Sequence, residues 1–271
     1  GVFLGRKTST PTASSGTVAA GPYPASQTFL LHSRPNSPRK IFLDFDGNTT
    51  SGTSWNSSYT AGASFTTPPF DTDGAVNTSF STAELDRIQL IWTRVCEDFA
   101  PFDVDVTTED PGLEGLRKTS STDTAYGVRV CVGGSSYDWF GAGAGGVAYV
   151  GSFNWNSDTP CFIFTAQLGN GAEKYSAEAT SHEVGHTLGL YHDGQVATST
   201  TSAVEYYQGH GDWAPIMGVG YYKPLVQFSK GEYNGANNKE DDFVVAQNFG
   251  LPMRIDDYGS STAAATPPTP P

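Results

Sequence analysis

Several residue types are scarce in this sequence, and each shortage excludes a class of protein. Among its 271 residues only three are cysteines, too few for a scaffold built on disulfides, and the odd count leaves at least one thiol without a partner inside the chain. No run of 18 apolar residues occurs, so no membrane-spanning helix is expected. Fifteen basic residues face 28 acidic ones, and the net charge of −13 disfavours nucleic acid and anionic membrane surfaces as partners. What remains is an acidic chain, long enough to bury one substantial core.

Both ends of the sequence are also poor in apolar periodicity. Residues 1–36 are rich in Ser, Thr, Pro, Gly and Ala, and we interpret them as an extended arm or the remnant of a pro-segment. Residues 255–271 finish in Pro and Thr and predict a linker to a further domain. The first residue is Gly1, with neither a methionine nor an apolar signal segment, which we interpret as a processed form. Residues 37–254 are therefore expected to form one folded domain.

Between these ends, the apolar pattern predicts alternating strands and helices. A helix is expected to begin at Ser81, whose side chain forms a capping box with Glu84, and to end before Pro101. The stretch 47–80, full of Gly, Ser, Thr and Asn, is expected to be a long loop. The other predicted elements are strands over 41–45, around 104–106, over 128–132, 147–150 and 161–165, a helix from about 172 to 188, and a last helix over 239–249 capped by Asn238.

Three of the five histidines lie within eleven residues, at spacings of four and six. On a helix, His182 and His186 stand one turn apart on the same face and can reach one ion. Gly189 allows the positive φ that ends a helix and bends the chain back, which brings His192 toward the same ion. Three neutral imidazoles leave the fourth corner of a tetrahedral Zn²⁺ open to water, and Glu183 is expected beside it as general base. The alternative is a helix with histidines on its polar surface, which leaves the glycine and the third histidine unexplained.

The extended pattern from His182 to His192 resembles that of the metzincin clan of zinc endopeptidases. Metzincins also carry a methionine in a tight turn beneath the three histidines. Of the two methionines in this chain, Met217 lies downstream of His192, and Pro215, Gly218 and Gly220 give its surroundings the composition of a turn. The alternative for Met217 is an ordinary buried methionine near a loop.

The resemblance covers residues 37–250 and implies an α+β fold. The expected catalytic domain has a mixed five-stranded sheet with two helices above the cleft, and an irregular lower subdomain that ends in a helix. In metzincins an edge strand pairs antiparallel with the substrate backbone, which gives affinity without strong sequence selectivity. By position, the residues expected to bind substrate are Gly146, Val147, Ala148 and Tyr149 on this strand, and Val219 and Tyr221 in the wall after the methionine. A further core strand is the alternative interpretation of 146–149.

Two details concern the metal and its surroundings. Astacins and serralysins have an extra tyrosine ligand two residues after the methionine, but that position is Val219 here, so neither it nor Tyr221 is expected on the metal. Asp44, Asp46 and Asn48 alternate as calcium ligands do, so a Ca²⁺ site is considered, although a plain turn at the end of a strand is the preferred interpretation.

The subfamily is left open by conflicting features. Paired aspartates at Asp241 and Asp242 resemble the last helix of matrixins, whereas Asp193, directly after the third histidine, resembles the reprolysin group. A bacterial matrixin-like branch is our hypothesis. If the strands that carry Cys131 and Cys161 are neighbours, as in metzincins, a disulfide between them is one outcome. None of the three cysteines lies on a mobile arm, so latency through a cysteine bound to zinc is not expected.

Together these features predict a monomeric, secreted zinc endopeptidase that acts on proteins or peptides. Few lysines and abundant Ser, Thr, Gly and Tyr are typical of secreted enzymes. Two rivals are considered: a binding module that keeps the fold without cutting, and a zinc hydrolase that acts on another bond. An intact Glu183 argues against the first, because a binding module has no use for the base.

Overall fold

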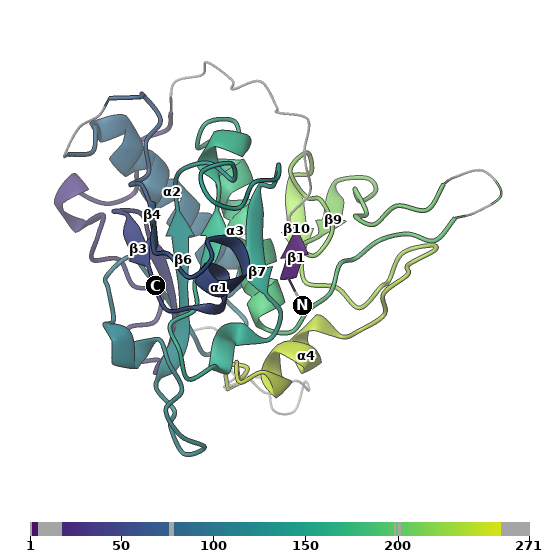
Figure 1. Ribbon diagram of the computed structural model, residues 1–271. Helices are drawn as coiled ribbons and strands as arrows, with labels where there is room; N and C mark the ends of the chain where they lie inside the picture. Colours follow the sequence, from purple (N-terminus) through teal and green to yellow (C-terminus); the bar gives the residue numbers. More distant parts are fainter. Residues whose placement is uncertain (1, 5–17, 76–78, 198, 200–201, 256–271) are drawn as a thin grey trace, which may run out of the picture.

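The strands and helices predicted from the sequence occur in the expected order, and further short elements lie between and beside them (Figure 1). The computed structural model describes residues 2–4 through their backbone and residues 18–75, 79–197, 199 and 202–255. Its strands are β1 Val2–Leu4, β2 Arg39–Asp44, β3 Asn48–Thr50, β4 Phe65–Thr67, β5 Asp105–Thr107, β6 Tyr126–Val132, β7 Gly146–Tyr149, β8 Cys161–Ile163, β9 Trp213–Pro215 and β10 Leu225–Gln227. Its α-helices are α1 Ser54–Tyr59, α2 Thr82–Asp98, α3 Glu173–Thr187 and α4 Asp242–Asn248. Short 3-10 helices occupy Ala25–Gln27, Leu113–Gly115, Ser152–Asn154 and Thr165–Gln167.

The central sheet has the strand order β1-β7-β8-β6-β2-β5. Strands β8, β6, β2 and β5 run parallel, and β7 is antiparallel to β8. These are the five strands of the mixed sheet that the sequence predicts, so the expected α+β architecture is confirmed. A sixth strand, β1, extends the sheet beyond β7 and comes from the amino-terminal segment that the sequence did not assign to the sheet.

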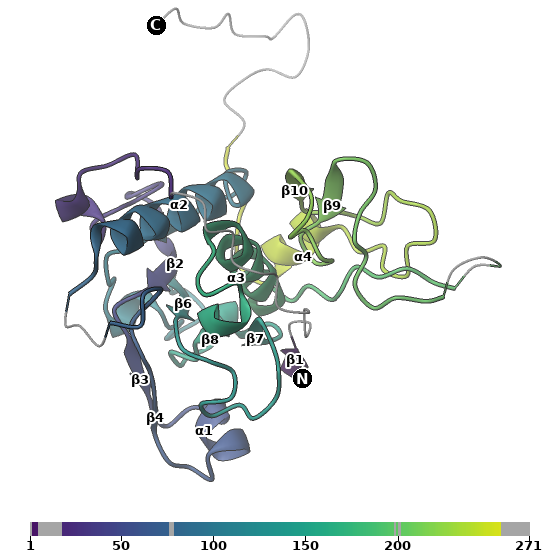
Figure 2. The same ribbon diagram turned by 90° about the horizontal axis from the view of Figure 1, so that it is seen from above.

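Both faces of the sheet are covered, as Figure 2 shows. Helices α2 and α3 lie on one face, and their apolar side chains join strand residues such as Val130 and Ile163 in the larger core. Helix α1 and the β3–β4 ribbon lie on the other face, where Trp55 packs with Phe162. The expectation of a long loop over 47–80 is therefore wrong. The reason is Trp55, which is fully buried and donates a hydrogen bond from Nε1 to Pro160 O at 2.8 Å, a contact that local composition does not reveal.

The ends of α2 and α4 follow from their caps. Ser81 Oγ accepts a hydrogen bond from Glu84 N and the Glu84 carboxylate accepts one from Ser81 N, so the predicted capping box starts α2. Helix α4 starts later than predicted, because the capping residue is Asp241 and not Asn238. Asn238 Oδ1 instead accepts a hydrogen bond from Glu240 N in the turn before the helix.

The described residues between 190 and 255, which form the lower subdomain, are irregular except for three short elements. Strands β9 and β10 form a parallel pair, and α4 lies beneath them at the right of Figure 1. This arrangement agrees with the expected lower subdomain that ends in a helix. None of the described helices is both long and apolar enough to cross a bilayer.

The segment 18–36 packs on the surface of the domain. Tyr23 N donates to Gln89 Oε1 of α2 at 2.8 Å, and Gln89 Nε2 donates to Thr28 Oγ1 at 2.8 Å. The Tyr23 ring also meets Trp92 of α2 edge-on at 5.7 Å. The linker predicted over 255–271 lies outside the described residues except for Ile255.

The three cysteines are free, so the disulfide considered for Cys131 and Cys161 is not formed. Their strands β6 and β8 are neighbours, as expected, but Cys161 lies opposite Val130 and Cys131 lies opposite Phe162. This offset of one residue directs the two thiols to opposite faces of the sheet, one in each apolar cluster.

Candidate metal centre

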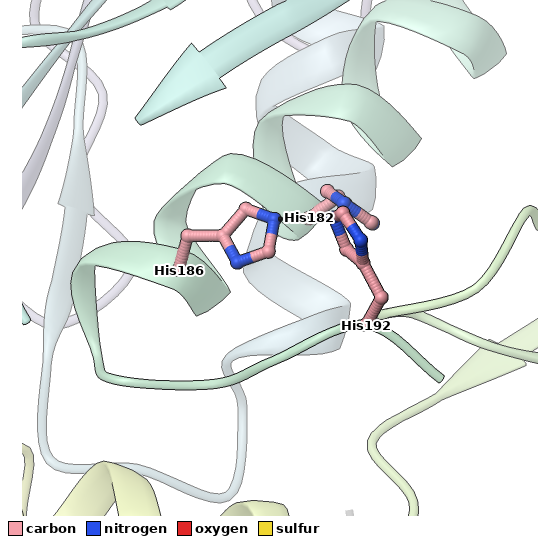
Figure 3. Close-up of side chains that lie close together, drawn as sticks. All are labelled: His182, His186 and His192. Atoms are coloured by element: carbon pink, nitrogen blue, oxygen red, sulfur yellow. Dashed lines mark hydrogen bonds between the residues drawn. The ribbon is translucent and has the colours of Figure 1, made fainter. Parts of the chain in front are cut away.

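Helix α3 and the loop that follows it bring three histidines together (Figure 3). His182 and His186 lie one turn apart on α3, whose last helical residue is Thr187. Gly189 has a φ of +87°, a left-handed conformation that reverses the chain after the helix. His192 then returns to the same point, and one ligand atom from each of the three rings lies within 4.8 Å of the others.

Each imidazole is held in place through its Nδ1 atom. The partners are Ile216 O for His182 at 2.9 Å, Leu190 O for His186 at 2.8 Å, and Glu205 Oε1 for His192 at 3.0 Å. Because carbonyl and carboxylate oxygens only accept, Nδ1 carries the proton in each ring, and the Nε2 lone pair is directed toward the shared space. This is the usual orientation of metal-binding histidines, whose other nitrogen is fixed by an oxygen.

The donor atoms fit a cation. Nε2 of His186 lies 3.0 Å from Nε2 of His192, and with Nδ1 protonated in both rings these two lone pairs face each other. His182 Nε2 and Glu183 Oε2 are buried and have no hydrogen-bond partner. Such orphaned atoms cost free energy, which a metal ion and its water would recover. Three imidazole nitrogens are the donor set of a catalytic zinc site.

Burial sets the charge state of the four residues. It lowers the pKa of His182 to about 4, and it lowers that of His192 to about 3, with the nearby His182 adding to the effect. The pKa of His186 falls well below its usual value for the same reason, and because of His182 and His192. The imidazoles are therefore neutral at pH 7, the form that binds metals. Burial raises the pKa of Glu183 well above its usual range, and a divalent cation nearby would lower it again.

Glu183 lies between the histidines and the sheet. Its side chain is 1% exposed, and a Cβ built on Gly146 of β7 would lie 2.5 Å from Glu183 Cγ. Only glycine therefore allows this close approach of β7 to α3. Glu183 and His182 line a small pocket together with Tyr206, Val219 and Tyr221.

Met217 occupies a turn beneath the histidines. Gly218 N donates to Pro215 O at 3.0 Å, and Asp193 N donates to Met217 O at 2.9 Å. The methionine is fully buried, with its sulfur against Gly185 of α3. The preceding carbonyl, Ile216 O, is the acceptor that orients His182, so the turn and the metal centre form one unit.

Two residues near the centre, Glu205 and Tyr206, were not predicted from the sequence. Glu205 orients His192, and the Tyr206 ring lies 4.2 Å from the His192 ring. Asp193, which directly follows the third histidine, is 2% exposed, and its Oδ2 has no hydrogen-bond partner. Glu205 and Tyr206 come from a loop thirteen or more residues after His192, and no periodic pattern marks that loop.

The residues expected to bind substrate lie on β7 and in the segment after Met217. Gly146, Val147, Ala148 and Tyr149 form β7, the outermost of the five predicted strands, and its outer edge is paired with β1. Val219 is 5% exposed in the wall after Met217. The Tyr221 hydroxyl lies against Gly145, and Tyr221 is not in the described metal-binding group.

The calcium site considered at Asp44, Asp46 and Asn48 receives no support. Asp44 Oδ2 accepts a hydrogen bond from Arg129 Nη1 at 2.7 Å, so a partly buried guanidinium balances its charge. Among the described residues, the only other acidic group with suitable spacing is Asp71, Asp73 and Glu84, in which the Glu84 carboxylate is already used by the cap of α2.

Residues 98–193 match the model of the family described as metallo-peptidase family M12B, reprolysin-like. The matched segment runs from the last residue of α2 through α3 to Asp193, and it includes the three histidines. No curated protein matches the chain. The match agrees with the resemblance of Asp193 to the reprolysin group, whereas the paired aspartates of the last helix lie outside the matched residues.

Proposed function

We propose that this metzincin-type zinc metallopeptidase is a secreted endopeptidase in which His182, His186 and His192 bind the metal and Glu183 is the general base. The observation that carries the proposal is the convergence of three neutral imidazole nitrogens within 4.8 Å, beside a buried carboxylate oxygen that has no partner. A site built only for stability would have its fourth side closed by protein. Here His182 and Glu183 line a pocket instead.

His182, His186 and His192 would hold the zinc through Nε2. When bound, zinc supplies a Lewis acid that polarises the substrate carbonyl and makes water more acidic. The hydrogen bonds to Ile216 O, Leu190 O and Glu205 fix the rings in the orientation that this chemistry requires.

Glu183 moves the proton. Its Oε2 takes a proton from the attacking water and returns it to the nitrogen of the leaving amine, so no side-chain nucleophile is needed. The close contact with Gly146 keeps the carboxylate at the start of β7.

The substrate is a protein or peptide that binds as an extended strand along β7. Backbone groups of Gly146, Val147, Ala148 and Tyr149 would pair with it in the antiparallel sense. Val219 and Tyr221 line the adjacent pocket and would contact the side chain that follows the scissile bond. Affinity then comes mainly from the main chain and selectivity from the pocket.

The catalytic domain is assigned to residues 37–254, and the enzyme is proposed to act as a monomer outside the cell. The low lysine content and the abundant Ser, Thr and Gly support the location. Sedimentation of the purified chain tests the monomer, since a stable dimer would sediment at twice the mass.

Hydrolysis of casein with and without a chelator tests the function. We expect cleavage that stops with chelation and returns when zinc is restored. Zinc binding without cleavage of casein or of a peptide library would overturn the proposal in favour of a binding module. Cleavage confined to a cell-wall amide would favour the hydrolase that acts on another bond.

A further inference from the structure

The amino-terminal strand β1 covers the outer edge of β7. Val2 lies opposite Tyr149, Phe3 opposite Ala148 and Leu4 opposite Val147, in the antiparallel sense. Figure 1 shows β1 beside β7. The inner edge of β7 is paired with β8. Both edges of β7 are therefore occupied, and a second peptide cannot pair with it while β1 is in place.

β1 also runs toward the metal centre. The pairing ends with Leu4 at Val147, one residue from Gly146, where β7 contacts Glu183. An extended substrate on β7 would run in the same direction and cover the same backbone groups. β1 thus occupies the place of the substrate residues that precede the scissile bond.

The rest of the amino-terminal segment is fixed to the same molecule. Gly21 N donates to Asp86 Oδ1 of α2 at 2.9 Å, and Ser33 N donates to Val106 O of β5 at 3.0 Å, at the opposite end of the sheet. Five strand spacings of about 4.8 Å separate the two edges, roughly 24 Å. The chain from residue 4 to residue 18 can reach about 48 Å when extended. The chain between β1 and the anchored residues is therefore long enough for β1 to pair with β7 of the same molecule.

We propose that residues 2–4 are an intramolecular competitor of the substrate, which must leave β7 before a peptide can bind. This inference rests on the proposed function, in which β7 is the substrate-binding edge. Three residues form a weak pair on their own, but tethering raises their effective concentration to about the millimolar range or above. The enzyme is then partly self-inhibited, and loss of β1 activates it.

The competing explanation is that β1 is a permanent sixth strand that only stabilises the sheet. In that case, loss of the pairing should leave activity unchanged or lower it. The test uses the full chain with the substitutions V2P/F3P/L4P, because proline has no N–H to donate and disrupts a strand pair. The variant V2A/F3A/L4A keeps the backbone donors. The variant T8P/S9P/T10P controls for proline outside the pairing segment.

Two measurements are made on each chain. Hydrogen exchange followed by mass spectrometry reports the protection of the amides in 146–150, whether or not the enzyme cuts. Hydrolysis of a fluorogenic peptide at several concentrations gives kcat and KM. For V2P/F3P/L4P we expect faster exchange in β7, KM at least about fivefold lower and kcat unchanged. V2A/F3A/L4A should show a smaller change, and T8P/S9P/T10P none.

Unchanged exchange in V2P/F3P/L4P would overturn the proposal, because β1 would then not cover β7. Faster exchange with kcat/KM equal to that of the unmodified chain, or lower, would also overturn it and favour the structural strand. If none of the chains cuts any peptide with zinc bound, the proposed function fails, and inhibition fails with it. The exchange result would in that case decide only whether residues 2–4 cover β7.

Discussion

Helices α2 and α3 lie on the same face of the sheet but differ in what they bury (Figure 2). Six of the seventeen residues of α2 are buried, and four of these are the apolar residues Ile88, Ile91, Trp92 and Val95. Twelve of the fifteen residues of α3 are buried, and most of these are polar. Helix α2 also has a capping box, whereas the N-cap residue of α3, Ala172, makes no side-chain capping hydrogen bond.

The difference shows how stability and chemistry are divided between the helices. Burying a polar group costs free energy unless it is hydrogen-bonded. Most polar groups of α3 are compensated, as Thr180 is by Ser176 O and Ser181 is by Asp98. The uncompensated atoms of His182 and Glu183 face the metal centre. Helix α2 thus stabilises the domain, and α3 holds reactive groups that the rest of the fold must support.

Replacing His186 on α3 should have the largest effect. The change His186→Ala removes one of three metal ligands, so zinc should be lost and activity should fall by more than about 10⁴-fold, a large share of the enhancement that enzymes provide. Metal analysis and casein hydrolysis measure the two losses. His210→Ala, on an exposed loop histidine, is the control and should change neither. Retained zinc and activity in the His186 variant would remove this histidine from the site.

On α2, substitution of Ile88 should reduce stability and leave catalysis intact. Its side chain is fully buried in the larger core, and Ile88→Ala should lower the free energy of unfolding by about 2–5 kcal/mol. Urea denaturation measures the change, with the exposed Glu97→Ala as control. The folded variant should keep the kcat/KM of the unmodified chain. A large loss of kcat/KM at full zinc occupancy would show that the two helices are not divided in this way.

Glu205 should affect zinc affinity although it is not a metal ligand. The change Glu205→Ala removes the acceptor for His192 Nδ1, and loss of such a partner lowers metal affinity by about 10–100-fold. Because Glu205 is largely exposed, we expect a value near the lower limit. Glu205→Gln should restore part of the affinity, since an amide oxygen also accepts. Competition with a chromophoric chelator measures it, and equal affinity in all three chains would exclude the positioning role.

Asp98, at the end of α2, joins the two helices and should give a pH effect. Its Oδ2 accepts a hydrogen bond from Ser181 Oγ at 2.6 Å, and burial raises the pKa of Asp98 from 3.8 to about 7. A raised folded-state pKa means that this contribution to stability is fully present below about pH 4 and is lost as the pH rises to about 7. Asp98→Asn should remove a slope of at most about 1.4 kcal/mol per pH unit in that range. Parallel pH profiles of unfolding for the two chains would contradict this.

The sequence predicted the parts of the fold that depend on local patterns. The capping box of Ser81 and Glu84, the left-handed Gly189 and the histidine spacing are all found as expected. Contacts between distant segments could not be predicted. The pairing of β1 with β7 and the one-residue offset between Cys131 and Cys161 are set by tertiary structure, and no local pattern records them.

Contacts between distant segments also could not be predicted around the metal centre. Its three histidines come from one helix and the turn after it, so their spacing in the sequence was enough to predict that they lie together. Two of the acceptors that orient these rings, Ile216 O and Glu205, lie in other loops. No periodic pattern in the sequence predicts them.

The claim that α3 holds the reactive groups is tested most directly by the variant Glu183→Gln. Its zinc content and its rate of peptide hydrolysis are measured in the same preparation. The amide is nearly isosteric, so the fold and the three histidines are undisturbed, but it cannot accept a proton from water. We expect full zinc occupancy with a rate lower by about 10²–10⁴-fold, the usual loss when a general base is removed. A Glu183→Gln variant that holds zinc and cuts at the rate of the unmodified chain would show that Glu183 is not the base.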